Sequence, residues 1–188
     1  MSSSRYTDNQ SDLVTDYTLH AGRLKRYATW PIHHVQTVGE HCWQIARIFE
    51  AIFGPPRAEI ERFIRHHDTE ELIVGDPPFP LKKNNPDLKA IYDRLGASAM
   101  KGFGIQLPEL TDNEKVQVKI CDLIEMMEFG LVELEMGNQL AKAVITRTRD
   151  AVRLFAERLP EEERPKVERY ILQQFMRHTA VMKFEATY

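Results

Sequence analysis

Apolar residues recur every three or four positions through most of the chain, the spacing of an amphipathic helix. The clearest case begins at Thr111, which forms a capping-box pattern with Glu114. The apolar positions of this helix are Val116, Ile120, Leu123, Ile124, Met127, Leu131 and Leu134. We find no convincing segment with the two-residue alternation of a strand. The pattern predicts an all-α protein.

The same period predicts further helices, bounded by prolines and glycines. Pro31 stops the first, Gly54 ends the second, and Pro160 separates the last two. In chain order, the predicted helices cover about 13–28, 37–54, 55–68, 88–102, 138–159 and 161–179.

Length and repeats bear on the domain organisation. A chain of 188 residues without internal repeats suits one domain, 1–188, with a full core. Residues 1–11 are small and polar, and we expect a flexible start there. The helices within 138–188 are expected to complete the bundle, to form a subunit interface, or both.

Composition excludes several classes of protein. With 28 acidic and 25 basic residues, the chain lacks the basic excess of duplex-binding proteins, so we expect no nucleic-acid polymer as partner. We expect no membrane association and a cytoplasmic protein, because the chain has neither a long apolar run nor a signal-peptide pattern. Cys42 and Cys121 are far apart, which predicts free thiols that pack in the core.

Histidine and aspartate side chains interrupt the apolar faces of three predicted helices. His41 lies on an aliphatic ridge of the second, His67 and Asp68 continue the apolar face of the third, and Asp122 interrupts a ridge of the long helix. The apolar residues that define these faces are Val38, Ile45, Ile48, Ile52, Ile60, Phe63, Ile64, Val118 and Met126.

Taken singly, each has a structural explanation. His41 is explained as a hydrogen-bonded core histidine, and Asp122 as the partner of a lysine or arginine on a neighbouring helix. Taken together, two imidazoles and two carboxylates that face one core indicate a site for one divalent metal ion. This ligand set suits Mn²⁺, Co²⁺, Ni²⁺, Fe²⁺ or Zn²⁺ and does not choose among them.

The order His41, His67-Asp68, Asp122 resembles the HD-domain superfamily of metal-dependent phosphohydrolases. Within it, four segments are similar to motifs of bacterial 5'-deoxynucleotidases and of phage-type deoxynucleoside triphosphate (dATP) triphosphohydrolases. These segments are GRLKRYATWP (22–31), TVGEHCWQIA (37–46), HDTEELIVGDPPFPLK (67–82) and EKVQVKICDLIE (114–125). The resemblance covers about residues 20–135, and the remainder matches only in being helical.

The resemblance implies an all-α HD-domain bundle, usually homo-oligomeric, that hydrolyses 2'-deoxynucleoside 5'-phosphates with a divalent metal ion. It assigns His41, His67, Asp68 and Asp122 as the metal ligands. It also assigns Glu71 to the attacking water, Asp76 to orienting the reacting groups, and Trp30 to contacting the sugar and disfavouring a 2'-hydroxyl.

One position departs from the family pattern. The monophosphatases carry an arginine directly before the tryptophan, and this chain has Thr29. Arg23 and Arg26, which precede Trp30, are further candidates for binding phosphate.

The segment after the HD pair adds further candidates. Glu71 follows Asp68 by three positions, so the helical spacing predicts both on one face, with Glu71 placed to accept a proton. Gly75 permits a helix end, and the prolines of GDPPFP stiffen the turn that holds Asp76. Phe79 offers an apolar surface for sugar or base, and Lys82 and Lys83 are either phosphate ligands or solvated surface.

Several functions remain open at this point. The main prediction is a 5'-deoxynucleotidase that acts on monophosphates. A triphosphohydrolase that cuts the same bond is the first alternative, and Thr29 favours its longer phosphate tail. An alarmone hydrolase would carry two adjacent acidic residues, whereas in this chain Glu71 is followed by Leu72, which counts against that activity. A cyclic-nucleotide phosphodiesterase normally needs more metal-binding histidines than this chain places at the site. The last alternative is a catalytically silent helical interaction module without metal.

Overall fold

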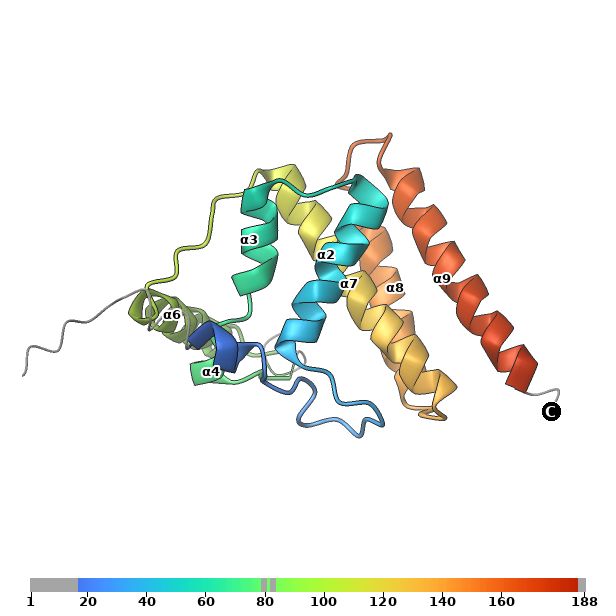
Figure 1. Cartoon of the computed structure of the whole chain (residues 1–188), viewed down its shortest axis with the longest axis horizontal. Coiled ribbons are helices and arrows are strands. Elements are labelled where there is room, and N and C mark those ends of the chain that lie inside the picture. The colour runs from blue at the N-terminus through green and yellow to red at the C-terminus, as the bar shows by residue number, and fades with distance from the viewer. Residues whose placement is uncertain (1–16, 79–80, 82–83, 186–188) are drawn as a thin grey trace, which may run out of the picture.

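The computed structural model describes residues 17–78, 81 and 84–185, and these residues form helices joined by loops (Figure 1). The described residues contain no β-strand, and their one β-type contact is an isolated bridge between Lys25 and Thr37. The all-α prediction is therefore confirmed. In this part of the chain, no helix has the length and apolar character needed to cross a membrane.

Helix α7 (Asp112–Glu135) is the centre of the bundle. Its first turn carries the predicted capping box: Thr111 Oγ1 accepts from the Glu114 N–H at 3.3 Å, and Glu114 Oε2 accepts from the Thr111 N–H at 2.8 Å. The helices that pack against α7 are α2 (Val38–Phe53), α3 (Ala58–His66), α8 (Ala141–Ala156) and α9 (Arg164–Glu185).

The main core lies between these helices. Ile45 of α2 and Ile124 of α7 are fully buried in it, and Val152 of α8 and Val167 of α9 join the same cluster. The C-terminal helices therefore contribute to the bundle core. Cys42 and Cys121 are free, buried thiols in this cluster, and burial raises the pKa of Cys42 to about 12.

A second, smaller cluster lies around α6 (Pro86–Gly102), at the left of Figure 1. It consists of Met100, Phe103 and Ile105, with Leu72 of the short helix α4 (Glu71–Val74) and Tyr17 packed against it. Gly96 lets α6 approach the α4 region closely, because a Cβ there would lie 2.9 Å from Glu70 Cγ.

The predicted first helix, 13–28, is wrong beyond residue 21. Residues 13–16 lie outside the described part, 17–21 are helical, and the chain then leaves the helix at Gly22. Gly22 packs backbone to backbone on Gly39, whose N–H donates to the Gly22 carbonyl at 3.0 Å. This contact with the start of α2 directs residues 22–37 across the end of the bundle as an irregular segment.

The third helix ends earlier than expected, at His66. Residues 67–70 form a turn, and α4 starts at Glu71, so Asp68 and Glu71 do not share one helix. They remain close because the Glu71 N–H donates to the Asp68 carbonyl at 3.2 Å. Gly75 ends α4 at a φ of 73°, as its sequence position predicted.

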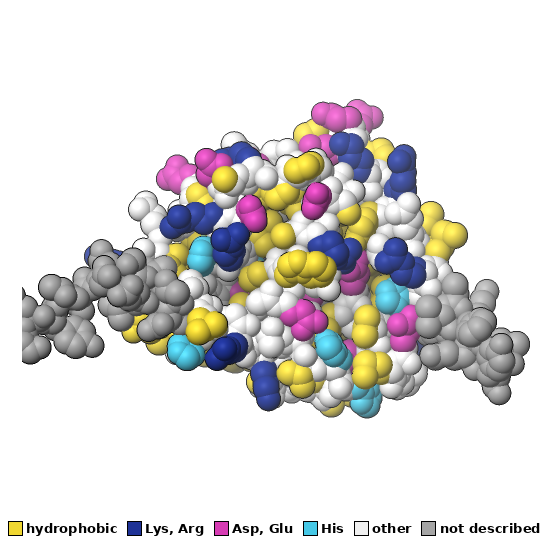
Figure 2. All heavy atoms as spheres, in the orientation of Figure 1, with side chains coloured by type: hydrophobic (Ala, Val, Ile, Leu, Met, Phe, Trp, Pro, Cys, Tyr) yellow, Lys and Arg dark blue, Asp and Glu magenta, His cyan; other side chains and the backbone are white. Residues whose placement is uncertain are grey.

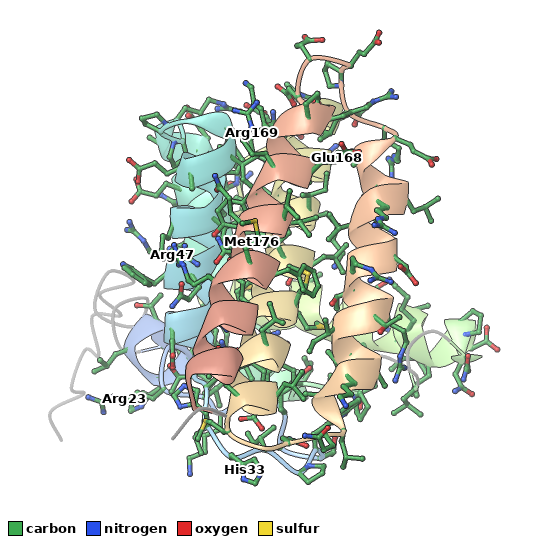
Figure 3. All side chains as sticks on the ribbon, turned by 90° about the vertical axis from the view of Figure 1, so that its right-hand side faces the viewer. Arg23, His33, Arg47, Glu168, Arg169 and Met176 are labelled. Carbon is green, nitrogen blue, oxygen red and sulfur yellow. The ribbon has the colours of Figure 1, made fainter. Side chains whose placement is uncertain are left out.

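The surface carries both signs of charge. On the face drawn in Figure 2, Lys and Arg side chains alternate with Asp and Glu, and apolar side chains are exposed over α9 at the right. Exposed apolar residues on α8 and α9 include Leu154, Leu172 and Met176. Figure 3 shows α9 in front of α7, with Arg47 of α2 beside it and Met176 on its outer side.

Candidate metal centre

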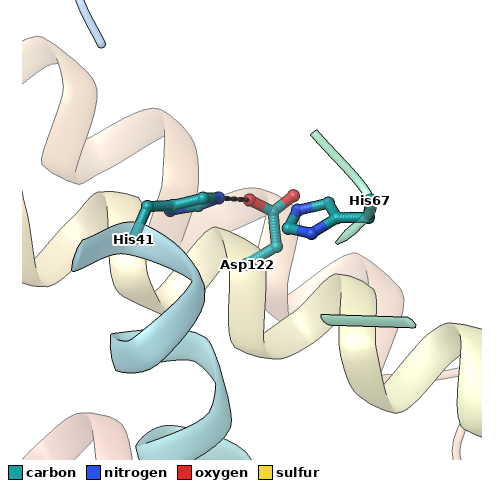
Figure 4. Close-up of side chains that lie close together, drawn as sticks. All are labelled: His41, His67 and Asp122. Atoms are coloured by element: carbon teal, nitrogen blue, oxygen red, sulfur yellow. Dashed lines mark ion pairs between the residues drawn. The ribbon is translucent and has the colours of Figure 1, made fainter. Parts of the chain in front are cut away.

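Three side chains from separate elements converge where α2, α7 and the end of α3 meet (Figure 4). His41 lies on α2, His67 follows α3 directly, and Asp122 lies on α7. One donor atom from each lies within 4.8 Å of the others. The structure thus brings together three of the four residues that the sequence predicted as metal ligands.

His41 is fully buried and is held by Glu125. Its Nδ1–H donates to Glu125 Oε2 at 2.6 Å, which leaves Nε2 directed at the cluster, where it can bind a metal ion once it is deprotonated. Nε2 is 3.4 Å from Asp68 and 3.6 Å from Asp122, yet it has no hydrogen-bond partner. Burial lowers the pKa of His41, but Asp68 and Glu125 outweigh that effect and raise it to about 9.

His67 has the same arrangement with a backbone partner. Its Nδ1–H donates to the Ile64 carbonyl at 2.8 Å, so the neutral ring offers Nε2 as a lone-pair donor. Nε2 lies 3.4 Å from Asp68 Oδ1. Both histidines therefore present the nitrogen that a metal ion would use.

Asp68 lies beside the cluster and pairs with Arg26. Its Oδ2 accepts from the Arg26 guanidinium at 2.8 Å, and its two oxygens each lie 3.4 Å from a histidine Nε2. Burial opposes ionisation, but His67, His41 and Arg26 hold the pKa of Asp68 well below its usual range. Asp68 is outside the tight group of three and close enough to complete its shell.

The two carboxylate oxygens of Asp122 face different partners, one outside the cluster and one inside it. Oδ2 accepts from Lys119 at 2.6 Å, while Oδ1 faces His41 Nε2. Burial opposes its charge, but Lys119, His41 and His67 lower the pKa of Asp122. The cationic partner expected from a neighbouring helix is instead Lys119 of α7 itself, and it leaves the oxygen that faces the cluster available.

This donor set fits a divalent ion. Two imidazole nitrogens and carboxylate oxygens are ligands of first-row transition ions. The buried Nε2 of His41 also lacks a partner, and an unpartnered buried polar atom is costly. A cation between His41, His67 and Asp122 would satisfy that atom and offset the carboxylate charge.

A cavity of about 720 Å³ lies between α4 and α6, and His67 of the cluster and the adjacent Asp68 line it. On the side of the centre, the cavity is lined by His67, Asp68, Glu71 and Gly75; on the side of α6, by Tyr92, Asp93, Gly96 and Lys101. Asp76, which is half-buried, lies between the lining residues Gly75 and Pro77. Glu71 and the HD pair therefore border one space large enough for a small molecule.

The remaining predicted contacts are dispersed. Arg23 is exposed on the turn after residues 17–21, whereas Arg26 is buried at the cluster. Trp30 is half-buried and donates its backbone N–H to the Tyr27 carbonyl at 2.9 Å. Phe79, Lys82 and Lys83 lie outside the described residues.

The sequence reasoning missed the residues that hold the ligands. Glu125 orients His41, and Gln36 in turn donates to Glu125 Oε1 at 2.5 Å. A signal for Glu125 was present, since it is a carboxylate inside the apolar run ICDLIEMM, three positions after Asp122. Gln36 had no such signal, because its partner is 89 positions away.

Comparison with known proteins agrees with this geometry. No family model matches the chain. A cyanophage S-2L HD phosphohydrolase (DatZ), solved with dA and one catalytic Zn²⁺ ion, superimposes with a TM-score of 0.71, covers 87% of this chain and 96% of its own, and is 20% identical. The fold is thus that of an HD phosphohydrolase.

Relatives by sequence narrow the class. The Photorhabdus temperata 5'-deoxynucleotidase yfbR is 30% identical over 164 residues, which cover 72% of this chain and 83% of the relative. A 5'-deoxynucleotidase of Yersinia pestis (strain Pestoides F) is 29% identical over the same coverage. The chain belongs to the 5'-deoxynucleotidase family.

Proposed function

We propose that this protein is a metal-dependent hydrolase that cleaves the 5'-phosphoester of 2'-deoxynucleoside monophosphates, releasing deoxynucleoside and phosphate. The observation that carries the proposal is the His41, His67 and Asp122 cluster, whose His67 lines the cavity bordered by Glu71. Membership of the family and the likeness to a phosphohydrolase bound to dA support the substrate class.

His41, His67, Asp68 and Asp122 would hold one divalent ion. When bound, such an ion lowers the pKa of water and offsets charge on the phosphoryl oxygens. The nitrogen and oxygen donor set supports a transition ion such as Mn²⁺, Co²⁺, Ni²⁺, Fe²⁺ or Zn²⁺.

The protein's own groups supply the rest of the chemistry. Glu71 borders the cavity next to Asp68 and accepts the proton of the attacking water. Arg26 brings a buried positive charge to Asp68, at the place where a phosphate would approach. Trp30 contacts the sugar, and Asp76, beside Gly75, orients the reacting groups.

The charge of the cavity favours a monophosphate over a triphosphate. Among the described lining residues, Asp68, Glu70, Glu71 and Asp93 are acidic and Lys101 is basic. A triphosphate tail carries several more negative charges than a monophosphate and is repelled more strongly by this lining. Triphosphate hydrolysis is therefore the second candidate, which Thr29 and the lysine pair 82–83 would favour.

The test is a substrate panel on the metal-loaded protein. We expect dAMP and other deoxynucleoside monophosphates to yield deoxynucleoside and phosphate with a transition ion, and AMP to react far more slowly. Chromatography of parallel incubations with dAMP, dATP and AMP gives the products. Release of triphosphate from dATP with dAMP unchanged would establish the second candidate, and no turnover of any deoxynucleotide would reject both.

We also propose a cytoplasmic homo-oligomer. The exposed Leu154, Leu172 and Met176 on α8 and α9 support association, since burial of large apolar side chains stabilises an interface. Two free, buried thiols are consistent with a reducing compartment. Sedimentation measures the association directly, and a monomer at all concentrations would contradict it.

A further inference from the structure

Residues 26–36, the segment that carries Trp30, lie against one stripe of α7. The stripe consists of Glu125, Phe129 and Glu133, which are spaced four positions apart and share one face of the helix. Each of the three contacts a different part of the segment. The same helix carries Asp122, so it connects the metal centre with this segment.

Glu133 holds the middle of the segment. Its carboxylate is 1% exposed and accepts the backbone N–H of His33 at 2.9 Å and that of His34 at 2.7 Å. It also accepts from Asn138 Nδ2 at 2.8 Å, and the same Nδ2 donates to the Pro31 carbonyl at 2.8 Å. Figure 3 shows His33 at the lower end of the bundle, where α7 ends.

These bonds favour a charged carboxylate in a buried place. Burial disfavours the charge, but donation from Asn138 and from the backbone of His33 and His34 lowers the pKa of Glu133. Bonds to an ionised acceptor are stronger than those between neutral groups. Glu133 therefore fixes Pro31, His33 and His34 with respect to α7.

Phe129 holds the start of the segment. Its ring stacks on Tyr27, with centroids 4.5 Å apart and planes inclined by 19°. Tyr27 has a φ of 57°, the left-handed region that a tyrosine rarely adopts. Such a conformation persists where surrounding contacts enforce it, and stacking on Phe129 provides one.

Both ends of the segment reach the metal centre. Arg26 pairs with Asp68, and Gln36 donates to Glu125, which holds His41. A shift of the middle of the segment would therefore move Trp30 and strain both attachments.

We propose that Glu133 is a positioning residue for substrate binding, which fixes the 26–36 segment and so holds Arg26 at Asp68 and sets the position of Trp30. The inference rests on the proposed function in one respect, that Trp30 and Arg26 contact the deoxynucleotide. Glu133 itself touches neither the cluster nor the cavity lining.

The first experiment measures the segment without any reaction. The chain has two tryptophans, Trp30 and the exposed Trp43, so Trp43→Phe leaves Trp30 as the sole indole reporter. In that background we expect Glu133→Gln to shift Trp30 emission to longer wavelength and to increase its quenching by acrylamide. The amide would place an NH₂ donor against the Asn138 Nδ2 donor or against the backbone N–H groups, which breaks part of the network.

The second experiment measures substrate selection. We expect Glu133→Gln to raise the KM for dAMP about tenfold and to reduce the preference for dAMP over AMP similarly, as for loss of a buried charged hydrogen bond. The bound metal and kcat should change little. Glu128→Gln is the matched control, because this carboxylate on the same helix binds Arg47 and Tyr170 instead of the segment.

Each outcome decides the proposal. Unchanged Trp30 fluorescence in Glu133→Gln would overturn it, as would a fluorescence change with unaltered KM and selectivity, or the same KM change in Glu128→Gln. If Glu133→Gln does not fold, Asn138→Ala, which leaves the backbone donors to Glu133 intact, should give a smaller shift in the same direction. A wild-type protein that hydrolyses no deoxynucleotide would reject the proposed function, and the fluorescence comparison alone would then decide whether Glu133 positions the segment.

Discussion

Helix α7 supplies carboxylates to two regions that differ in how their polar groups are paired. Toward α9, Glu128 accepts from Arg47 and from the Tyr170 hydroxyl, and Glu135 binds His178 at 2.7 Å. Toward α2 and α3, Asp122 lies close to the ring nitrogens of two histidines, which can bind a metal ion once they are deprotonated. In the first region each acceptor meets a donor within the protein; in the second, possible metal ligands from three elements point into one space.

This difference distinguishes a contact that stabilises the fold from a site that can bind a metal ion. A buried polar group is stable when it is paired, and the α7–α9 contact pairs its carboxylates within the protein. The cluster of His41, His67 and Asp122 leaves the buried His41 Nε2 without a partner. In the metal-free fold a proton on His41 offsets part of the carboxylate charge, and a bound metal ion would take the place of that proton. The two regions therefore respond differently to mutation, pH and metal removal.

The largest effect is expected from Asp122→Ala. Loss of this carboxylate removes a ligand and its charge, so the protein should lose bound metal and about 10⁴-fold in kcat/KM, equivalent to about 5.4 kcal/mol. Elemental analysis and dAMP hydrolysis measure the two effects. Full metal content and activity in the variant would place the ion elsewhere. Lys119→Met is the matched control, because it removes the Asp122 partner outside the cluster.

Glu71→Gln should separate chemistry from metal binding. Glu71 borders the cavity beside the HD pair and lies outside the group of three. We expect kcat to fall about 10²-fold or more, the usual range for loss of a general base, with metal content retained. Rapid-quench measurement of product formation checks the chemical step. Equal loss of metal and activity would instead make Glu71 a ligand.

Local periodicity was enough to predict α2 and α7, because each keeps an apolar stripe between clear end signals. It was also enough to select His41, His67 and Asp122, since a polar residue on a buried ridge needs a partner. The family resemblance added the roles proposed for Glu71 and Trp30, which periodicity does not provide.

The segment 22–37 and the break after His66 were not predictable in this way. Leu24 and Ala21 fit a helical period, but the contact between Gly22 and Gly39 and the stacking of Tyr27 on Phe129 determine the backbone instead. The role of Glu133 could not be predicted from the sequence either, because its partners His33 and His34 lie about a hundred positions away. Tertiary contacts of this range leave no trace in a local pattern.

The pH dependence should differ between the metal-free and the metal-loaded protein. The pKa of His41 is about 9 in the metal-free fold and near 6.5 in an unfolded chain, so its protonated form stabilises the fold. That stabilisation is complete below pH 6.5 and is lost as pH rises through about 9. Metal binding, which displaces the proton, should strengthen up to about tenfold per pH unit in the same window.

Denaturation midpoints at several pH values, with and without a chelator, measure the first effect, and metal titrations measure the second. The metal-loaded protein should show little of the decrease in stability between pH 6.5 and 9. A metal-free protein whose stability rises over that window would contradict the interpretation of His41.

The smallest effect should come from the paired region. Glu128→Gln keeps one acceptor oxygen and removes the charge that Arg47 and Tyr170 share, so we expect a loss of about 1 kcal/mol in the free energy of unfolding. Bound metal, KM and the preference for deoxynucleotides should be unchanged, because His41, His67 and Asp122, the cluster found among the described residues, all lie outside α9. Chemical denaturation and steady-state kinetics on one preparation measure both. A change in metal affinity would mean that the α7–α9 contact and the metal centre are coupled through α7, and the distinction between the two regions would not hold.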